Sequence, residues 1–472
     1  MYYALSRRRL IGLSVATAGG LLLASCAPAA APTPTPAPAK PAEAPKPAAQ
    51  PKAAPTPTPA AQPAAKTEGQ VVELQMAFTW EAAFQPVQEE FNKKFMERHP
   101  NIRIKSTYNT WADHNRIVPT WAAAKTLPDV IYVHGAYIQP WIKLGAFRSL
   151  EPYLKQDREF DFPNDFWPEP LKLYRYKGEH YAIPYDHGPL ILGYNKKIFD
   201  EAKVPYPKEN MTFEELLDLA RRLTKPGQQW GFQGLPISPN VFLITWTGGW
   251  GGEVIKVEND VEVGTLINDP RNIEALEWWA AMLHKHKVAP SPAEMQAIQG
   301  GPWLAGRVAM ATTASWNTPT YNKFGAFGKG NWDVAPWPKG PARQITGSFG
   351  SGFGITRDSK YPDAAWTYLR EYLSKEGQEF MWGRTGRGSV SRKSAYQSWM
   401  DSPEAPPSVK YFKEAMEKYA VIGRPISAVA NRVIDIINRE IDQVMNGQKS
   451  AKDAVAEIQR QADPILAENL KE

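Results

Sequence analysis

The chain has 472 residues, of which 43% are hydrophobic and 22% are charged, and its formal net charge is +6. Seven of the 55 basic residues and two of the 49 acidic residues lie in the first 70 positions, so the rest of the chain is close to neutral. The charge therefore gives no reason to expect a nucleic-acid partner, and the single cysteine rules out an internal disulfide.

Residues 1–25 are predicted to be a signal peptide. Three arginines at 7–9 precede an uncharged run at 10–25 of small and apolar residues, which is the layout of an export signal. The run is too short and too rich in Gly, Ala and Ser for a membrane span, which needs about 20 apolar residues. Residues 6–11 also resemble a twin-arginine signal, so both this route and ordinary secretion stay open.

Cys26 is predicted to carry a lipid. The segment Leu23-Ala24-Ser25-Cys26 resembles the lipobox of bacterial lipoproteins, which implies cleavage before the cysteine and acylation of its thiol. Residues 27–70 then hold 13 prolines among Ala, Thr, Gln and Lys, a composition that favours disorder with polyproline II character. We expect 26–70 to form an anchored linker whose reach is on the order of 130 Å.

The composition changes at Val71, and all 17 tryptophans lie at Trp80 or later. About 400 residues are enough for two domains with buried cores. Alternating or continuous apolar residues predict strands at 71–76, 101–104 and 127–133. Apolar residues at helical spacing predict a helix after the first strand, with one face formed by Phe84, Val87, Phe91 and Phe95.

Two later helices have clear boundaries. Thr212 and Glu215 have the spacing of a capping box, which predicts a helix at 212–223. Pro362 begins a second helix, predicted at 362–373. Because strands and helices alternate along the chain, we expect an α/β fold with mainly parallel sheets.

Several segments then occur in a specific order. They are GEHYAIP (178–184), GYNKKIF (193–199), TFEEL (212–216), GRVAM (306–310) with Trp316, and GSFGSGFG (347–354) followed by the helix at 362–373. Together they resemble the bacterial extracellular solute-binding proteins that include the maltose-binding proteins. The resemblance covers about residues 71–460, and the members of this family are the receptors of ABC importers.

The resemblance implies a two-lobe periplasmic-binding-protein fold with a ligand cleft between its α/β lobes. Lobe 1 would contain 71–187 and 350–392, and lobe 2 would contain 188–349 and 393–472. The chain would cross between them near 184–192, 345–353 and 388–396, where glycines suit a hinge because they tolerate many backbone conformations. Closure would be a hinge motion around the ligand.

The resemblance also implies the partners. A monomeric protein, anchored to the membrane through Cys26 in the periplasm or on the outer face of the plasma membrane, would deliver its ligand to an ABC permease. The ATPase of the importer would act indirectly. We expect no cofactor.

Ligand residues are expected in loops that follow strands, because these loops face the crevice in open α/β sheets. Aromatic planes cover the apolar faces of a sugar, and carboxylates or amides accept hydrogen bonds from its hydroxyl rim. In the resembled family, a ring at the position of Trp316 stacks on the pyranose. The predicted set suits a neutral mono- or oligosaccharide and comprises Trp80, Glu81, Trp111, His134, Tyr137, Tyr185, Asp186, Trp246, Trp250, Trp316, Gly350, Ser351 and Arg387.

Other ligands and functions stay open. Arg384, Arg387 and Arg424 could each hold a carboxylate or phosphate by bidentate pairing, so an acidic sugar or phosphoester is an alternative, as are a polyamine and a peptide. A surface-anchored glycoside hydrolase or lyase would need two carboxylates facing across a cleft, which Glu81 and Asp186 could supply. A structural or adhesive surface protein is a third class.

No metal site is predicted. The best candidate pair is His284 and His286, which lie two residues apart at a predicted helix end and therefore point in different directions.

Overall fold

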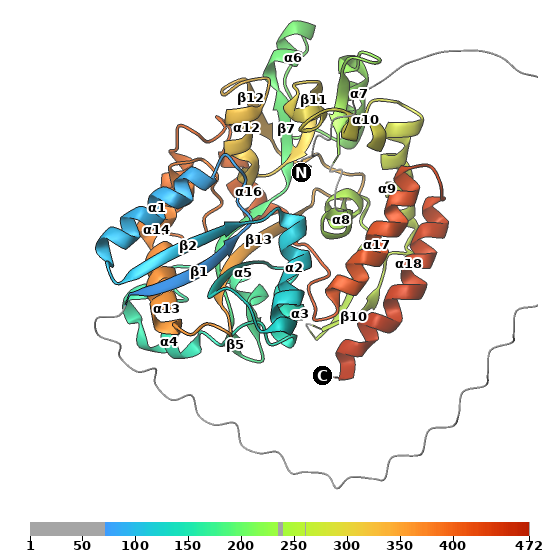
Figure 1. Cartoon of the computed structure of the whole chain (residues 1–472). Coiled ribbons are helices and arrows are strands. Elements are labelled where there is room, and N and C mark those ends of the chain that lie inside the picture. The colour runs from blue at the N-terminus through green and yellow to red at the C-terminus, as the bar shows by residue number, and fades with distance from the viewer. Residues whose placement is uncertain (1–70, 235–238, 260, 472) are drawn as a thin grey trace, which may run out of the picture. The chain divides into compact units, whose positions relative to one another are not determined.

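The computed structural model describes residues 71–234, 239–259 and 261–471. The predicted signal peptide at 1–25, the lipidated Cys26 and the linker at 26–70 lie outside the described residues. Within those ranges, no helix has both the length and the apolar character that a membrane crossing requires. The described chain forms two main β-sheets with helices on their faces (Figure 1).

The first sheet has the strand order β14-β13-β3-β1-β2, with β6 also paired to β13. Its first strand β1 (Val72–Phe78) runs parallel to β2 (Ile102–Tyr108) and to β3 (Val130–His134). These three strands confirm the predictions at 71–76, 101–104 and 127–133. The other members are β6 (Ile183–Pro189), β13 (Thr346–Ile355) and β14 (Ala420–Ile422).

Helices cover both faces of this sheet because the side chains of a strand alternate between its faces. Leu74, Met76 and Phe78 share one core with α1 (Gln85–Arg98) and α13 (Pro362–Tyr372). Ala77 belongs to a different core, formed with α2 (Trp111–Ala124) and α3 (Ile138–Lys143). Figure 1 shows α1 and α13 at the left of this sheet and α2 and α3 at its right. The predicted helices after the first strand and at 362–373 are therefore confirmed.

The second sheet has the order β12-β7-β11-β8. Helix α7 begins after Thr212, whose hydroxyl accepts the Glu215 N–H while the Glu215 carboxylate accepts the Thr212 N–H, so the predicted capping box is confirmed. Leu216, Ala220 and Leu223 face the core of this lobe. The elements are β7 (Ile191–Asn195), β8 (Trp230–Gln233), β11 (Val308–Thr313), β12 (Trp332–Ala335), α6 (Lys196–Ala202), α7 (Phe213–Leu223), α8 (Pro239–Thr247) and α9 (Pro270–His284).

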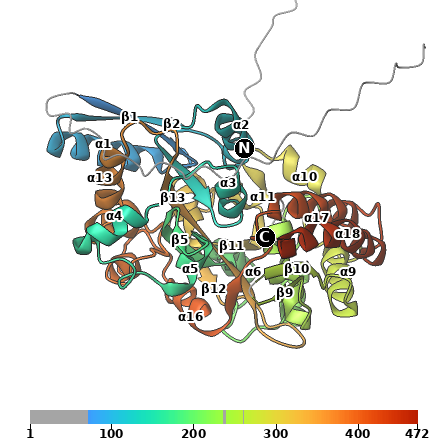
Figure 2. The ribbon, with the colours of Figure 1, turned by 90° about the horizontal axis from the view of Figure 1, so that it is seen from below.

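Two long C-terminal helices form a further core with α9 and a small hairpin. Helices α17 (Ala430–Met445) and α18 (Ala451–Leu466) place apolar residues such as Ile437 and Ile458 in this core. Figures 1 and 2 show both helices side by side, next to α9 and away from α1 and α13. The hairpin is β9 (Ile255–Glu258) with β10 (Val261–Thr265).

The shorter elements fill the connections. They are α4 (Glu151–Gln156), α5 (Pro168–Leu173), β4 (Arg175–Tyr176), β5 (Glu179–His180), α10 (Pro292–Ala297), α11 (Gly301–Leu304), α12 (Thr318–Phe324), α14 (Lys375–Gln378), α15 (Tyr396–Met400) and α16 (Lys410–Lys418).

The expectation of mainly parallel sheets is wrong, because both sheets are mixed. β13 runs antiparallel to β3 and β6, and β7 runs antiparallel to β11 and β12. These antiparallel pairs arise where the chain passes from one sheet to the other. β6 leads through Leu190 directly into β7, which runs against both of its neighbours, and β12 leads back to β13, which runs against β3 and β6 but parallel to β14.

The chain passes from the first sheet to the second at Leu190 and returns between β12 and β13, and a third segment lies beside β6. Val390 forms a bridge to Asp186, and Arg392 forms a bridge to Phe166. One element differs from the predicted division of the chain. β14 was expected in lobe 2 with the rest of 393–472, but it pairs with β13 at the edge of the first sheet.

The glycines of β13 are required for a different reason from the one expected. Gly347, Gly350, Gly352 and Gly354 are not among the glycines with positive φ, so the strand does not use their conformational freedom. Instead, neighbouring groups lie very close. A Cβ at Gly350 would lie 2.5 Å from the backbone oxygen of Asp186 and 2.8 Å from His187 Nδ1.

We expect Gly350→Ala to lower the free energy of unfolding by about 1–3 kcal/mol, because overpacking forces backbone to move. Urea denaturation measures the loss. Gly264→Ala in β10 is the matched control, since the first atom its Cβ would meet is Asp463 Oδ1 at 3.6 Å. Equal stability of the two variants would contradict the close approach of β6 to β13.

Candidate functional site

Five rings gather where the two sheets meet, and we call them the aromatic cluster: Trp111, His134, Tyr137, Trp316 and Phe349. Trp111 makes edge contacts with His134 at 6.0 Å and with Tyr137 at 5.7 Å between ring centroids. His134 lies nearly parallel to Phe349, at 6.4 Å and 19°. Trp316 packs on the buried group formed by Leu190, Ala314 and Phe349.

The fold explains why these residues meet. Trp111 opens α2 directly after Thr110, whose hydroxyl caps the helix by accepting the Asp113 N–H. His134 is the last residue of β3, and Tyr137 is the N-cap of α3. The carboxyl ends of parallel strands and the following helix starts lie at one edge of a sheet, so these side chains converge there.

The cluster combines both lobes and keeps part of its ring surface open. Trp316 follows β11 of the second sheet. Trp111, His134 and Tyr137 instead lie at the ends of β2 and β3 of the first sheet or at the helix starts that follow them. These four side chains are partly exposed, while Phe349 is buried behind them. Partly exposed rings backed by a packed core can present flat apolar faces to a ligand.

A second group, the charge cluster, consists of Glu81, Asp186 and Arg387. Arg387 Nη2 donates to both carboxylate oxygens of Glu81, at 3.3 and 3.4 Å, and its Nη1 lies 3.6 Å from Asp186 Oδ2. Only Glu81 reaches solvent appreciably, with 35% of its side chain exposed. The structure therefore brings these three predicted residues together as an ion-pair network on the first lobe.

Ser351 connects the two clusters. Its backbone N–H donates to Asp186 Oδ1 at 2.8 Å, and its hydroxyl is hydrogen-bonded to the Tyr132 hydroxyl. In β13 it lies opposite His134 on one side and Asp186 on the other. The predicted Gly350 and Ser351 are therefore part of the wall behind the aromatic cluster, and Gly350 lies opposite His187.

Burial dominates the electrostatics of the charge cluster. It raises the pKa of Asp186 to about 7, against the Arg387 charge and the Ser351 N–H, which both favour the carboxylate. Arg387 stays protonated, because the carboxylate charges of Glu81 and Asp186 raise its pKa against the effect of burial.

Trp80 and Tyr185 were predicted to contact ligand, but the structure encloses both rings. They are 2% and 1% exposed. Tyr185 stacks on Trp382 at 4.7 Å and 13°. The Arg387 guanidinium lies 4.7 Å from the Trp80 ring and 5.0 Å from the Phe84 ring. Trp80 and Tyr185 therefore support the charge cluster instead of presenting a face to a ligand.

Trp246 and Trp250 are likewise corrected. Both belong to the core of the second lobe and are 5% and 6% exposed. Trp250 stacks on Phe213 at 5.1 Å, and the carbonyl of Trp246 accepts the Trp279 indole N–H at 2.8 Å. Most residues of α8 and of the segment that follows it are apolar or small, which suits a buried position. We therefore leave both rings out of the ligand site.

The arginines considered for an anionic ligand have carboxylate partners. Arg384 pairs with Glu90 at 2.7 Å, and Arg424 pairs with the buried Glu262 at 2.9 Å. Glu262 also accepts the backbone N–H groups of Ile426 and Ser427. These contacts hold α1 to the segment 384–387 and β10 to the segment 424–427 before α17, which is a structural role.

His187 and Phe349 were missed by the sequence reasoning. His187 Nε2 and Ser348 Oγ are hydrogen-bonded at 3.0 Å, and the Ser348 hydroxyl also donates to the Val421 carbonyl. Burial, with a smaller effect of His134, lowers the pKa of His187 to about 3. A large residue among the glycines of 347–354, and a histidine directly after Asp186, were the available signals.

We expect His187 to make the protein less stable in acid. Its pKa in the folded protein lies below the usual 6.5, so acid protonates the unfolded chain more readily than the folded one. The contribution of neutral His187 to the free energy of unfolding is therefore present above pH 6.5 and is lost as the pH falls toward about 3. His187→Asn should therefore flatten the fall in unfolding free energy between pH 6.5 and 4, by roughly 2–3 kcal/mol. Parallel pH profiles of variant and wild type in urea denaturation would contradict this.

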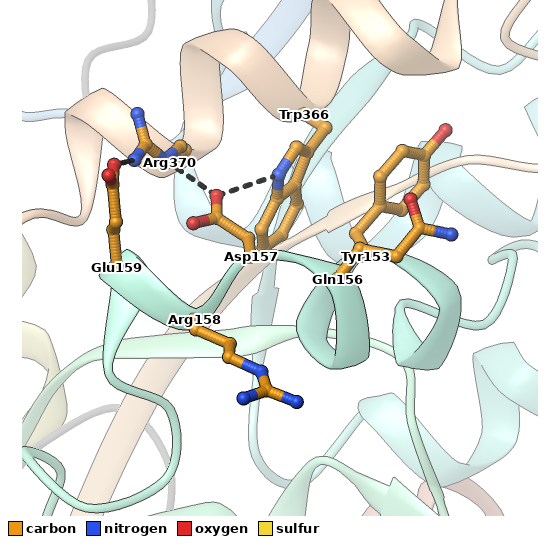
Figure 3. A pocket seen from close by; sticks show the side chains of 7 residues that line it. All are labelled: Tyr153, Gln156, Asp157, Arg158, Glu159, Trp366 and Arg370. Carbon is orange, nitrogen blue, oxygen red and sulfur yellow. Dashed lines mark hydrogen bonds and ion pairs between the residues drawn. The ribbon is translucent and has the colours of Figure 1, made fainter.

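A separate surface pocket of about 510 Å³ lies on the first lobe and does not include the clusters. Figure 3 shows its lining, in which Asp157 accepts the Trp366 indole N–H at 3.3 Å and pairs with Arg370 at 2.6 Å. Arg370 also pairs with Glu159. Since these polar groups satisfy one another and no predicted ligand residue lines the pocket, it is not the candidate site.

Known proteins resemble this chain over most of its length. A family model described as bacterial extracellular solute-binding protein matches residues 73–409. The GacH receptor of Streptomyces glaucescens, solved unliganded and with acarbose, is 25% identical, with a TM-score of 0.73 over 84% of this chain and 98% of its own.

Two further solved structures have the same fold. The ABC substrate-binding protein Lmo0181 from Listeria monocytogenes, in complex with cycloalternan, is 24% identical with a TM-score of 0.72, covering 84% of this chain and 98% of its own. An ABC transporter solute-binding protein from Thermotoga lettingae, bound with α-D-tagatose, is 18% identical with a TM-score of 0.74, covering 84% and 100%. The two sheets are therefore the two lobes of a known binding fold.

Proposed function

The chain belongs to the bacterial extracellular solute-binding protein family, and from this premise we propose that it captures a neutral mono- or oligosaccharide between its lobes. Membership of this family places it outside the cytoplasm. The ligand would contact the aromatic cluster and would then be delivered to the permease of an ABC importer.

The aromatic cluster is the observation that carries this proposal. Partly exposed rings from both lobes belong to this cluster, and rings of this kind cover the C–H faces of a sugar. Polar partners for the hydroxyl rim would come from Glu81 and from His134 of the cluster itself. The ligands of the three solved structures above, cycloalternan, acarbose and α-D-tagatose, are all carbohydrates.

The lipid anchor completes the proposal. Cys26 and the proline-rich tract, both outside the described residues, would hold the binding domain to the membrane and let it reach the permease. Radiolabelled palmitate or mass spectrometry of the N-terminus would detect acylation of Cys26, and a Cys26→Ser variant is the control.

The geometry does not support the alternative hypothesis of a glycoside hydrolase or lyase that uses Glu81 and Asp186. A glycosidase needs one carboxyl group as acid and another as base or nucleophile, on opposite sides of the scissile bond. Glu81 and Asp186 instead lie on one guanidinium of the same lobe. This arrangement suits a binding site whose charges are fixed.

A thermal-shift panel tests the proposal. The protein is heated with neutral mono- and oligosaccharides, short peptides, polyamines and glycerol phosphates, and the sugars are analysed afterwards. A ligand present at 100 times its dissociation constant adds about 2.7 kcal/mol to the free energy of unfolding, so the midpoint should rise with a neutral sugar that is recovered intact. A rise confined to peptides or polyamines would contradict the proposal.

A further inference from the structure

The arginine nearest to the aromatic cluster is already committed to carboxylates. Arg387 is 4% exposed, lies between Glu81 and Asp186, and is covered by the rings of Trp80 and Phe84. Its Nε and Nη1 have no hydrogen-bond acceptor among the described residues, and the face of the guanidinium lies over the two rings. One positive charge therefore faces two carboxyl groups.

The histidines near the ligand region add no positive charge at neutral pH. Loss of hydration beneath the surrounding rings lowers the pKa of the partly exposed His134 to about 4, and full burial lowers the pKa of His187 to about 3. Both imidazoles are neutral at pH 7 and offer only hydrogen bonds. Whether Asp186 is protonated or ionised, the charge cluster carries no net positive charge.

Contacts between the lobes join the segment that carries Trp316 to the segment that follows Arg387. Ser315, which directly precedes Trp316, donates to the carbonyl of Gly388 at 3.4 Å and to Ser389 Oγ at 3.0 Å. Gly388 follows Arg387 in the chain, so the side chain of Trp316 and the charge cluster lie on neighbouring segments. Glu81, which reaches solvent, is the charged member that an incoming ligand would meet.

We propose that Glu81 is a specificity-determining residue that makes the site accept neutral or cationic sugars and reject uronates and sugar phosphates. This inference rests on the carbohydrate-binding function proposed above. A carboxylate that meets the ligand first repels a like charge, while the arginine behind it is shielded by rings and by its own partners. Neutral and amino sugars meet a hydrogen-bond acceptor at the same place.

The test uses matched sets of hexose, hexuronate and hexosamine in the gluco, galacto and manno series, together with maltose and maltotriose. Isothermal titration calorimetry gives a dissociation constant for each compound. We expect the wild-type protein to bind a hexose at least tenfold more tightly than the hexuronate of the same series. The dissociation constant of the hexosamine should exceed that of the hexose by no more than about threefold.

Two variants separate the role of Glu81 from a general charge effect. Glu81→Gln removes the negative charge from a partly exposed side chain and keeps its shape, and it should reduce the preference for hexose over hexuronate by about tenfold. Glu97→Gln makes the same charge change on the exposed surface of α1 and should leave the preference unchanged. Circular dichroism confirms that both variants are folded.

Each outcome has one meaning. A uronate that binds the wild type as tightly as its hexose would overturn this inference alone, since the carboxylate would then have reached Arg387 Nε or Nη1. An unchanged preference in Glu81→Gln would also overturn it. Absence of binding by every saccharide in the panel would contradict the proposed function itself, and the inference with it.

Discussion

Replacing Trp316 with alanine should weaken carbohydrate binding by tenfold or more while leaving the protein folded. The ring lies between the lobes, is partly exposed and packs on Leu190, Ala314 and Phe349. An aromatic face is worth roughly 1 kcal/mol or more in such contacts, beyond the area that it buries. Since Trp316 is not fully buried, its loss should cost less stability than the about 3–5 kcal/mol of a core tryptophan.

Calorimetric titration of Trp316→Ala with the sugar selected by the thermal-shift panel measures the effect. Trp167→Ala is the matched control, because Trp167 is 36% exposed at the start of α5 on the first lobe and lies outside both clusters. Both variants should keep the far-UV spectrum of the wild type. Equal affinity of Trp316→Ala and wild type would remove this ring from the site.

Arg387→Met should lower the free energy of unfolding by about 3–5 kcal/mol, because it leaves the buried Asp186 without its counter-ion. Urea denaturation at pH 7.5 measures the loss. The control is Arg384→Met, which breaks an ion pair with Glu90 whose two side chains are both 43% exposed, and which should cost less than about 1 kcal/mol. Similar losses in the two variants would contradict the role assigned to Arg387.

The pH dependence of Arg387→Met gives a second measure of the same pair. The pKa of Asp186 is raised in the folded protein to about 7, so ionising this group destabilises the fold, and stability is lost as the pH rises from about 4 toward 7. Without Arg387 the pKa of Asp186 rises further. The difference in unfolding free energy between variant and wild type should therefore grow from pH 5 to pH 8, and adding Asp186→Asn should reduce it.

Much of the first lobe could be predicted from the sequence because its signals are local. The alternation of 71–76 and the apolar spacing from Phe84 to Phe95 each specify one element and its buried face. In the second lobe, the capping box of Thr212 and Glu215 fixes a helix start in the same way. Pairing direction could not be predicted, because it depends on where β7 and β13 enter their sheets after the chain has crossed between lobes.

The candidate site could be predicted only in part. Position after a strand identifies Trp111, His134 and Tyr137, but it does not tell whether a ring faces the cleft or the core. Trp80 follows β1 in the same way, yet it points inward because Arg387 stacks on it from a segment about 300 residues later. Partners so distant in the chain leave no periodic signal.

Calorimetric titration of the wild-type protein, followed by chemical analysis of the sugar, tests the central claim most directly. The account predicts one binding event per chain for at least one neutral carbohydrate, with the sugar recovered unchanged after prolonged incubation. Cleavage or modification of the sugar would contradict it by showing an enzyme. Absence of heat for every carbohydrate, with saturable binding of a peptide or polyamine, would contradict the assignment of the ligand class.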